Sequence, residues 1–230
     1  MMDSPAPLQR RTEGLYLVTD RGLCGQRGLE EVVSLAVKGG AAWVQLREKD
    51  LPTRPFVEEA SRLKKILAPL GVPLIINDRL DVVLASKADG IHIGQEDMPY
   101  EIARRLLGPK AIIGLSVETW EDVEQAQSLD VDYLGISPVF ATPTKTDTKG
   151  PWGLEGVSRI RAFSRHPLVA IGGISRANAA AVILAGSDCI AVVSAICAAP
   201  DPRRAAEDLC REISAAQEQQ KRAGQHCNRP

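Results

Sequence analysis

The sequence predicts an α/β protein that folds as a single-domain (β/α)8 TIM barrel, in which eight strand-and-helix units close on themselves. Three observations lead to this prediction. Eight short apolar runs recur along the 230 residues, helical patterns separate them, and no linker or shift in composition divides the chain. This length is enough for one large domain with a substantial core.

The apolar runs are the expected strands. Each is short and rich in β-branched residues, and several are apolar on both faces, which is typical of a parallel sheet covered by helices. In chain order they are 15–19, 42–46, 73–76, 90–93, 111–115, 132–136, 168–171 and 189–194.

Amphipathic helical patterns lie between these runs. The clearest covers 56–70, where apolar residues alternate spacings of four and three and so form one stripe on a helix. Similar stripes occur over 29–36, 177–184 and 205–213. An open doubly wound sheet is the alternative, but it usually carries a GxGxxG-type loop after its first strand. The first strand here ends in Val-Thr-Asp-Arg-Gly, so the closed barrel is preferred.

Composition limits the partners. Lys plus Arg number 28 and Asp plus Glu 29, so there is no basic excess for a nucleic-acid surface. The five cysteines are scattered and never spaced as CxxC, which argues against a disulfide framework or zinc site. No signal peptide or membrane-spanning run is evident, and we expect a cytoplasmic protein without a membrane partner. The barrel should cover 13–216, between flexible polar tails over 1–12 and 217–230.

Active sites of such barrels lie at the C-terminal ends of the strands. After the second expected strand, alternation places Gln45, Arg47 and Lys49 on one side of the barrel mouth. An amide, a guanidinium and an ammonium together suit a phosphate or diphosphate. The alternative is a strand end with solvated charges, and these residues alone do not decide between the two.

Two aspartates follow the third and fourth expected strands. Asp78 or Asp97 alone is best explained as a helix N-cap. Neighbouring strands, however, lie about 4.8 Å apart. Two carboxylates about 5 Å apart would repel by roughly 3 kcal/mol at an effective dielectric of ~20. A hard cation removes this repulsion, so the pair favours a Mg²⁺ site completed by water and phosphate oxygens.

The remaining strand ends offer further polar groups. Ser116 could bind a phosphate oxygen or a ring nitrogen, or cap the next helix. The loop over 141–150 is either a lid over an anion or a solvated surface loop. Gly172-Gly173 and Ser194 have the features of the barrel phosphate site, where backbone N–H groups hold the anion, although the glycines could simply form a tight turn. His92, inside the fourth strand, is interpreted as a packing residue.

Seven segments together resemble the thiamine-phosphate synthase family. They are LYLVTDR (15–21), VQLREK (44–49), INDR (76–79), GIHIGQED (90–97), FATPTKTDT (140–148), AIGGIS (170–175) and AVVSAI (191–196). The resemblance covers about 13–216 in the family's order. It departs from the family at Ser137, where Gly is frequent, which affects the expected placement of the loop that follows.

The resemblance implies a Mg²⁺-dependent transferase reaction in thiamine biosynthesis. A 4-amino-2-methyl-5-pyrimidinylmethyl diphosphate would condense with a hydroxyethylthiazole phosphate carboxylate to give thiamine phosphate and pyrophosphate. The diphosphate would leave first, through a pyrimidine-stabilised carbocation. The partners are thus two phosphorylated small molecules, and a homo-oligomer is compatible with the sequence.

The resemblance also implies residue roles. The pyrimidine diphosphate would be bound by Gln45, Leu46, Arg47, Glu48, Lys49, Asn77, Ser116 and Lys145. Of these, Lys145, Ser116, Arg47 and Lys49 would be catalytic. The thiazole phosphate would be bound by Thr142, Pro143, Thr144, Gly173, Val193 and Ser194, and Mg²⁺ by Asp78 and Asp97.

Three alternatives are weighed against this function. A thiazole tautomerase on the same barrel needs neither both aspartates nor the TPTK segment. A catalytically silent barrel that senses thiamine phosphate would have no reason to keep the metal pair. Another phosphate-binding barrel isomerase would explain the second phosphate region but not the first.

Overall fold

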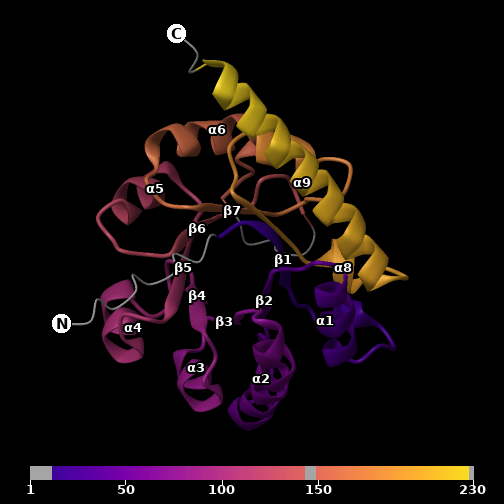
Figure 1. The fold of residues 1–230 in the computed structure, drawn as a ribbon. Coiled ribbons are helices and arrows are strands. Elements are labelled where there is room, and N and C mark those ends of the chain that lie inside the picture. The colour runs from indigo at the N-terminus through magenta and orange to yellow at the C-terminus, as the bar shows by residue number, and fades with distance from the viewer. Residues whose placement is uncertain (1–11, 143–148, 228–230) are drawn as a thin grey trace, which may run out of the picture.

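The computed structural model describes residues 12–142 and 149–227, with side chains described up to residue 222. Within these residues eight parallel strands pair in chain order, and β8 pairs with β1 to close the barrel (Figure 1). The strands are β1 Gly14–Val18, β2 Trp43–Leu46, β3 Leu74–Asn77, β4 Gly90–Ile93, β5 Ile112–Val117, β6 Tyr133–Ile136, β7 Leu168–Ile171 and β8 Cys189–Val192. The predicted fold class is confirmed, and every predicted run overlaps a strand.

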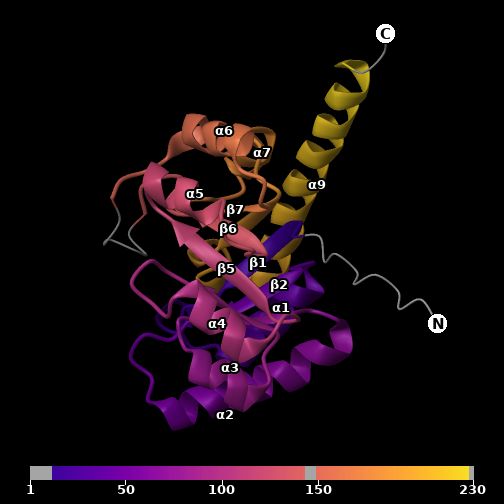
Figure 2. The ribbon, with the colours of Figure 1, turned by 90° about the vertical axis from the view of Figure 1, so that its left-hand side faces the viewer.

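Helices follow the strands and cover the outside of the barrel (Figures 1 and 2). They are α1 Leu29–Lys38, α2 Thr53–Leu67, α3 Leu80–Ser86, α4 Tyr100–Leu107, α5 Trp120–Ala126, α6 Gly153–Phe163, α7 Ala179–Leu184, α8 Ser194–Cys197 and α9 Pro202–Cys227. Two 3₁₀ turns, η1 Gly22–Cys24 and η2 Ala68–Leu70, complete the described elements. In the part that the structure describes, no helix is both long and apolar enough to cross a bilayer.

Two apolar layers stabilise the barrel. One lies between the strands and the helices, and the other fills the barrel interior. The interior layer contains Tyr16, Trp43 and Tyr133, whose ring centroids lie 5.8–6.3 Å apart. Gly114 leaves room for this cluster, because a Cβ there would lie 2.1 Å from the Tyr133 ring. Trp43 is thus a packing residue of the barrel interior.

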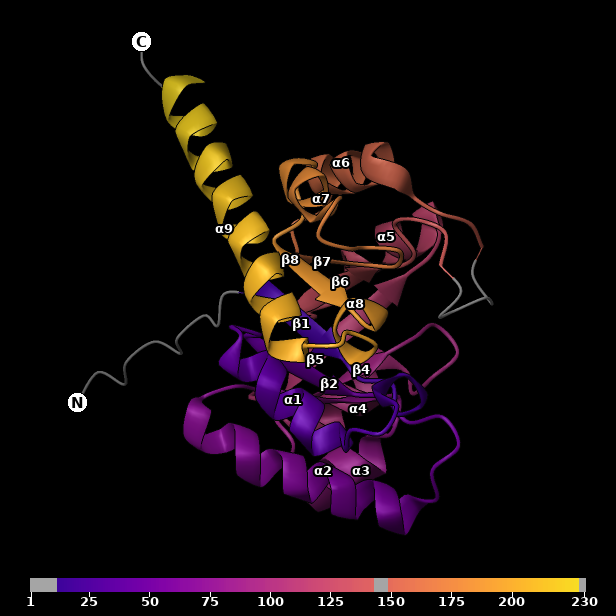
Figure 3. The same ribbon diagram turned by 90° about the vertical axis from the view of Figure 1, so that its right-hand side faces the viewer.

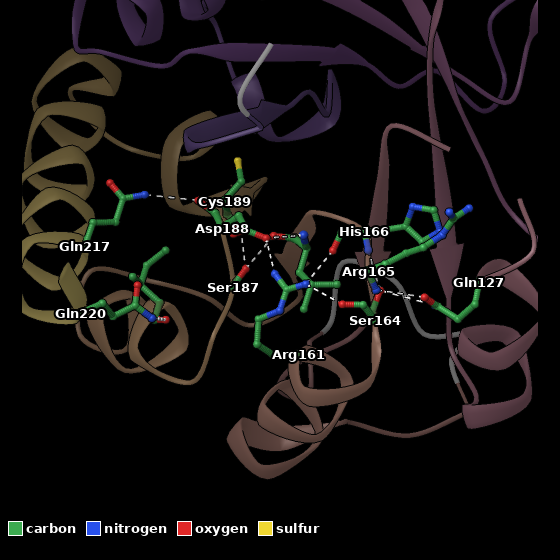
Figure 4. A network of polar contacts seen from close by, with 12 residues as sticks. Gln127, Arg161, Ser164, Arg165, His166, Ser187, Asp188, Cys189, Gln217 and Gln220 are labelled. Atoms are coloured by element: carbon green, nitrogen blue, oxygen red, sulfur yellow. Dashed lines mark hydrogen bonds and ion pairs between the residues drawn. The ribbon is translucent and has the colours of Figure 1, made fainter. Parts of the chain in front are cut away.

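The N-terminal ends of the strands carry a repeated polar arrangement. Asp89, Asp132 and Asp188 each precede a strand, accept a backbone N–H from the neighbouring strand and pair with a basic residue of an outer helix. The basic residues are Lys64, Arg104 and Arg161. Figure 4 shows the third instance, around Arg161 and Asp188. Such pairs at this end of a barrel serve stability and not catalysis.

The expectation of a loose tail from residue 217 is wrong for 217–227. Helix α9 packs against α1 and α7 and continues to Cys227 (Figure 3). Gln217 and Gln220 donate hydrogen bonds to the backbone oxygens of Asp188 and Ile183 (Figure 4). These bonds hold a segment that has no apolar stripe of its own. Of the predicted N-terminal tail only Thr12 is described, and it is buried.

Candidate active site

A cavity of about 680 Å³ opens at the C-terminal ends of the strands. All eight strands contribute lining residues, together with the loops that follow them. The predicted position of the site at the barrel mouth therefore agrees with the position of this cavity.

The end of β2 places three polar side chains on the cavity. Gln45, Arg47 and Lys49 all line it, as the alternation predicts. Leu46 and Glu48 point elsewhere: the Leu46 side chain is fully buried in the outer core, and Glu48 pairs with Arg21 at 2.9 Å. Their side chains are therefore not part of the lining, because successive residues of a strand face opposite sides.

Residues at the end of β1 hold this segment in place. The buried hydroxyl of Thr19 accepts a 3.0 Å hydrogen bond from the Arg47 backbone N–H. Arg21 bridges Glu48 and the buried Glu59 of α2. The Arg47 backbone is thus held by Thr19, and the side chain of its neighbour Glu48 is held by Arg21. No described residue pairs with the Arg47 guanidinium, which leaves that cation available to an anion in the cavity.

The two aspartates lie together at the mouth. Asp78 follows β3 in a left-handed conformation (φ 62°), and Asp97 accepts a 2.7 Å hydrogen bond from the Gly94 N–H. Asp78 is close enough to Asp97 to raise the pKa of its carboxyl group. Neither caps a helix, because the N-cap positions of α3 and α4 are Arg79 and Pro99. The capping interpretation is therefore excluded for both.

The electrostatics of this pair favour a cation. Burial raises the pKa of the Asp97 carboxyl, and the adjacent Asp78 raises it further, against a lowering by the Gly94 N–H and Lys49. Lys49 Nζ lies 2.8 Å from Asp78 Oδ2. In the described residues no group of three or more His, Cys, Asp or Glu surrounds one point. Two carboxylates with ligands from water and substrate are a usual donor set for Mg²⁺, so the residues fit that ion.

His92 is a cavity residue that sequence reasoning missed, and it contacts the predicted residue Ser116. Ser116 lines the cavity, and its Oγ lies 2.8 Å from His92 Nε2. Ser116 does not cap α5, whose capping box is formed by Thr119 and Asp122. His92 packs against Tyr133, as predicted, with stacked rings 5.5 Å apart, but it also faces the cavity. Its position in an apolar strand concealed this second role.

The opposite side of the cavity is formed by the loops after β6, β7 and β8. Thr142, Gly173, Val193 and Ser194 all line it. Pro143, Thr144 and Lys145, the other residues expected here, lie outside the described residues. Lys149 lines the cavity from the same loop. The Ser137 position also contributes to the lining, next to a cis peptide bond to Pro138.

Gly173 is required by its surroundings. Its φ of 62° lies in the left-handed region that glycine adopts without strain. A Cβ there would lie 2.8 Å from both the Ala141 oxygen and the Phe140 Cβ. The loop after β7 therefore approaches the loop after β6 closely, and the glycine also leaves its backbone open to the cavity.

These features define a class. The fold is a (β/α)8 barrel, and its mouth has cations and paired carboxylates on one side and glycine-containing loops on the other, as in barrel enzymes that act on phosphorylated small molecules.

Comparison with known proteins identifies the family. A family model described as thiamine monophosphate synthase matches residues 15–196, and the chain belongs to this family. The thiamine-phosphate synthase of Albidiferax ferrireducens is 59% identical over 201 residues, covering 87% of this chain and 92% of the relative. That of Leptospira biflexa is 55% identical over 202 residues, covering 86% and 96%.

A solved structure agrees with this assignment. The thiamine phosphate pyrophosphorylase from Pyrococcus furiosus superposes with a TM-score of 0.83 at 39% identity and covers 91% of this chain and 98% of its own. The chain is thus a transferase of thiamine biosynthesis that acts on small molecules, and the resemblance seen in its motifs is confirmed.

Proposed function

We propose that the cavity joins a 4-amino-2-methyl-5-pyrimidinylmethyl diphosphate to a hydroxyethylthiazole phosphate or its carboxylate, releasing pyrophosphate and, from the carboxylate, also CO₂. The observation that carries the proposal is the division of one cavity into two different sides. Arg47, Lys49 and the Asp78–Asp97 pair gather on one side, and the glycine-containing loops on the other. One enzyme that binds a diphosphate and a monophosphate at the same time needs both.

The diphosphate belongs on the side formed by β2 to β4. Arg47 offers a planar fork of N–H donors to phosphate oxygens, and Lys49 offers a mobile ammonium. Asn77, buried at the end of β3, lines the same side and offers an amide. Asp78 and Asp97 would hold Mg²⁺ beside them. When bound, the ion would stabilise negative charge on the departing diphosphate.

The thiazole phosphate belongs on the side formed by the loops after β6, β7 and β8. The backbone at Gly173 and the residues Val193, Ser194 and Thr142 line the cavity on this side. Glycine backbone N–H groups bind phosphate closely because no side chain stands in the way. We also propose that Thr144 binds the thiazole phosphate and that Lys145 binds the diphosphate.

We propose a dissociative order of bond breaking. The methylene C–O bond of the pyrimidine breaks first and its electron pair leaves with the diphosphate. The thiazole nitrogen then donates its lone pair to the resulting carbocation. The site is suited to this order because its cations face the leaving oxygens. The attacking nitrogen carries no proton, so bond formation needs no base.

The decisive assay is incubation with both substrates and Mg²⁺, followed by chromatography for thiamine phosphate and pyrophosphate in equal amounts. Product formation excludes a sensor and a tautomerase together. Release of pyrophosphate that does not depend on the thiazole, with no thiamine phosphate, would contradict the proposal.

The order of steps has a separate electronic test. An electron-withdrawing substituent on the pyrimidine destabilises the carbocation, so single-turnover bond formation should slow by several orders of magnitude. At about 1.36 kcal/mol per tenfold, this slowing corresponds to an increase of several kcal/mol in the activation free energy of bond formation. A nearly unchanged single-turnover rate at saturating thiazole would exclude the dissociative order.

We further propose that the reaction takes place in the cytoplasm and involves neither nucleic acid nor membrane lipid. The net charge of −1 supports the absence of these two partners, since nucleic acids and anionic membranes attract strongly basic proteins.

A further inference from the structure

Five side chains from five different strands form one hydrogen-bonded chain across the floor of the cavity. They are Gln45, Tyr16, Tyr133, His92 and Ser116, from β2, β1, β6, β4 and β5. Successive contacts measure 3.1, 3.0, 3.0 and 2.8 Å. All five residues line the cavity. The family resemblance implies a substrate-binding role only for the two ends, Gln45 and Ser116, so the three residues between them need an explanation.

The chain has a direction. Gln45 Nε2 donates to the Tyr16 hydroxyl, which is buried together with that of Tyr133. A buried hydroxyl hydrogen must find an acceptor. Tyr16 therefore donates to Tyr133, and Tyr133 donates to Nδ1 of His92. This leaves the imidazole hydrogen on Nε2, from where it is donated to Ser116 Oγ.

This direction determines what each end offers to the cavity. The hydrogen bond from one amide hydrogen to Tyr16 fixes the orientation of the Gln45 amide, so its carbonyl oxygen, an acceptor, points away from Tyr16. The Ser116 oxygen accepts from His92, so its own hydrogen is directed elsewhere as a donor. Among the described residues, neither group has a further side-chain partner. One end of the chain is thus an acceptor and the other a donor.

We infer that this chain makes the cavity selective for a heteroaromatic ring that carries an amine on one side and an unprotonated ring nitrogen on the other. A 4-aminopyrimidine has this pattern, and the inference rests on the proposed function. A 4-oxopyrimidine presents an acceptor in place of the amine and an N–H in place of one ring nitrogen. It would place acceptor against acceptor or donor against donor. Tyr16, Tyr133 and His92 are positioning residues in this scheme.

The polarity matters energetically because Gln45 is buried and Ser116 is partly buried. A site built to hydrogen-bond a substrate N–H or O–H rejects an analogue that lacks it by about 10,000- to 100,000-fold. Without one of the two tyrosine hydroxyls, the direction of the hydrogen bonds is no longer fixed. Loss of the Tyr16 hydroxyl allows the Gln45 amide to rotate, and loss of the Tyr133 hydroxyl allows the imidazole hydrogen to move to Nδ1. The ends can then match the oxo ring.

The test compares kcat/KM for the 4-amino substrate and its 4-oxo analogue. Tyr16→Phe and Tyr133→Phe each remove one oxygen and keep the ring. Each should reduce the preference for the amino substrate by at least about fivefold, the equivalent of one hydrogen bond of about 1 kcal/mol. Tyr100→Phe is the matched control. Tyr100 lies on α4, outside the cavity lining, and its hydroxyl donates a hydrogen bond to the Asp130 backbone oxygen. This substitution should leave the preference unchanged.

A second measurement keeps the inference independent of turnover. In ¹⁵N-histidine-labelled protein, with His92 identified by comparison with His92→Gln, Nε2 should carry the hydrogen and Nδ1 should not. Protonation at Nδ1 would overturn the inference, as would an unchanged preference in both folded tyrosine variants. Failure of the wild type to form thiamine phosphate would count against the proposed function alone, and the imidazole measurement would still decide the direction of the chain.

Discussion

The ammonium of Lys49 lies 2.8 Å from Oδ2 of Asp78, so a cation from the end of β2 covers one of the two carboxylates at the mouth. The Lys49 side chain is 54% exposed, and a pair this open to solvent contributes at most about 1 kcal/mol. Lys49 can therefore exchange Asp78 for a phosphate at little cost. The contact keeps the ammonium beside the position that we propose for the diphosphate.

The carboxylate pair leads to the first prediction. Asp78→Asn and Asp97→Asn should each raise the Mg²⁺ concentration for half-maximal activity more than about tenfold, since even residues that only orient metal ligands cost 10- to 100-fold. Mg²⁺ with pyrophosphate should raise the Tm of the wild type and not of these variants. Asp81→Asn, which removes an exposed partner of Arg79 outside the cavity, is the control. Wild-type metal dependence in both variants would remove the metal assignment.

The second prediction concerns Thr19, which sequence reasoning did not select. Thr19→Val keeps the shape but leaves the Arg47 N–H without its 3.0 Å acceptor. An unsatisfied buried group costs about 1–3 kcal/mol. The free energy of unfolding should fall by that amount in urea titration, and KM for the pyrimidine diphosphate should rise while KM for the thiazole phosphate stays constant.

Thr53→Val is the control for this change, because it removes a hydroxyl bonded to Arg79 on the exposed surface. Equal rises in KM for both substrates in Thr19→Val would mean that Thr19 supports the barrel in general and not the diphosphate segment.

Much of the site follows from the sequence because strand alternation and the order of strands in a closed barrel determine which residues meet. Gln45, Arg47 and Lys49 came to one side, and Asp78 met Asp97, for this reason. The same alternation turns the side chains of Leu46 and Glu48 away, although the family motif spans them.

The polar floor could not be predicted, because Tyr16, His92 and Tyr133 stand in apolar strands and look like core residues. Their chain depends on which residues face each other across the barrel, and on the space that Gly114 leaves. The extension of α9 was also missed. Gln217 and Gln220 hold the end of α9 by hydrogen bonds to backbone oxygens. Contacts of this kind produce no apolar stripe in the sequence, so the helical pattern was not visible there.

The third prediction separates close packing from backbone strain. Gly173→Ala places a Cβ 2.8 Å from the Ala141 oxygen and the Phe140 Cβ, at φ 62°. Gly71→Ala has nearly the same conformation, φ 68°, with nothing within 4 Å. Both should lose stability from the positive φ, but only Gly173→Ala should also raise KM for the thiazole phosphate. Titration calorimetry measures the affinity of each variant for the thiazole phosphate. Equal affinity in the two variants would mean that Gly173 has no role in phosphate binding.

The fourth prediction concerns pH. Burial lowers the pKa of His166, which precedes β7 at the N-terminal end of the barrel (Figure 4). Its Nε2 lies 3.0 Å from the Ala126 oxygen. The folded state therefore favours the neutral imidazole. Its contribution to stability is complete above the ordinary pKa of 6.5 and is lost as the pH falls through the lower folded value. The free energy of unfolding should fall more between pH 7.5 and 5 in the wild type than in His166→Gln. Parallel pH profiles would contradict this.

The division of the cavity into two anion-binding sides is tested most directly by a crystal structure with thiamine phosphate, pyrophosphate and Mg²⁺ bound together. Pyrophosphate should contact Arg47 and Lys49 and share the ion with Asp78 and Asp97. The phosphate of thiamine phosphate should lie against Gly173 and Ser194, with its aminopyrimidine on the floor between Gln45 and Ser116. Pyrophosphate at Gly173 and Ser194, or an ion away from both aspartates, would contradict the assignment of the two sides.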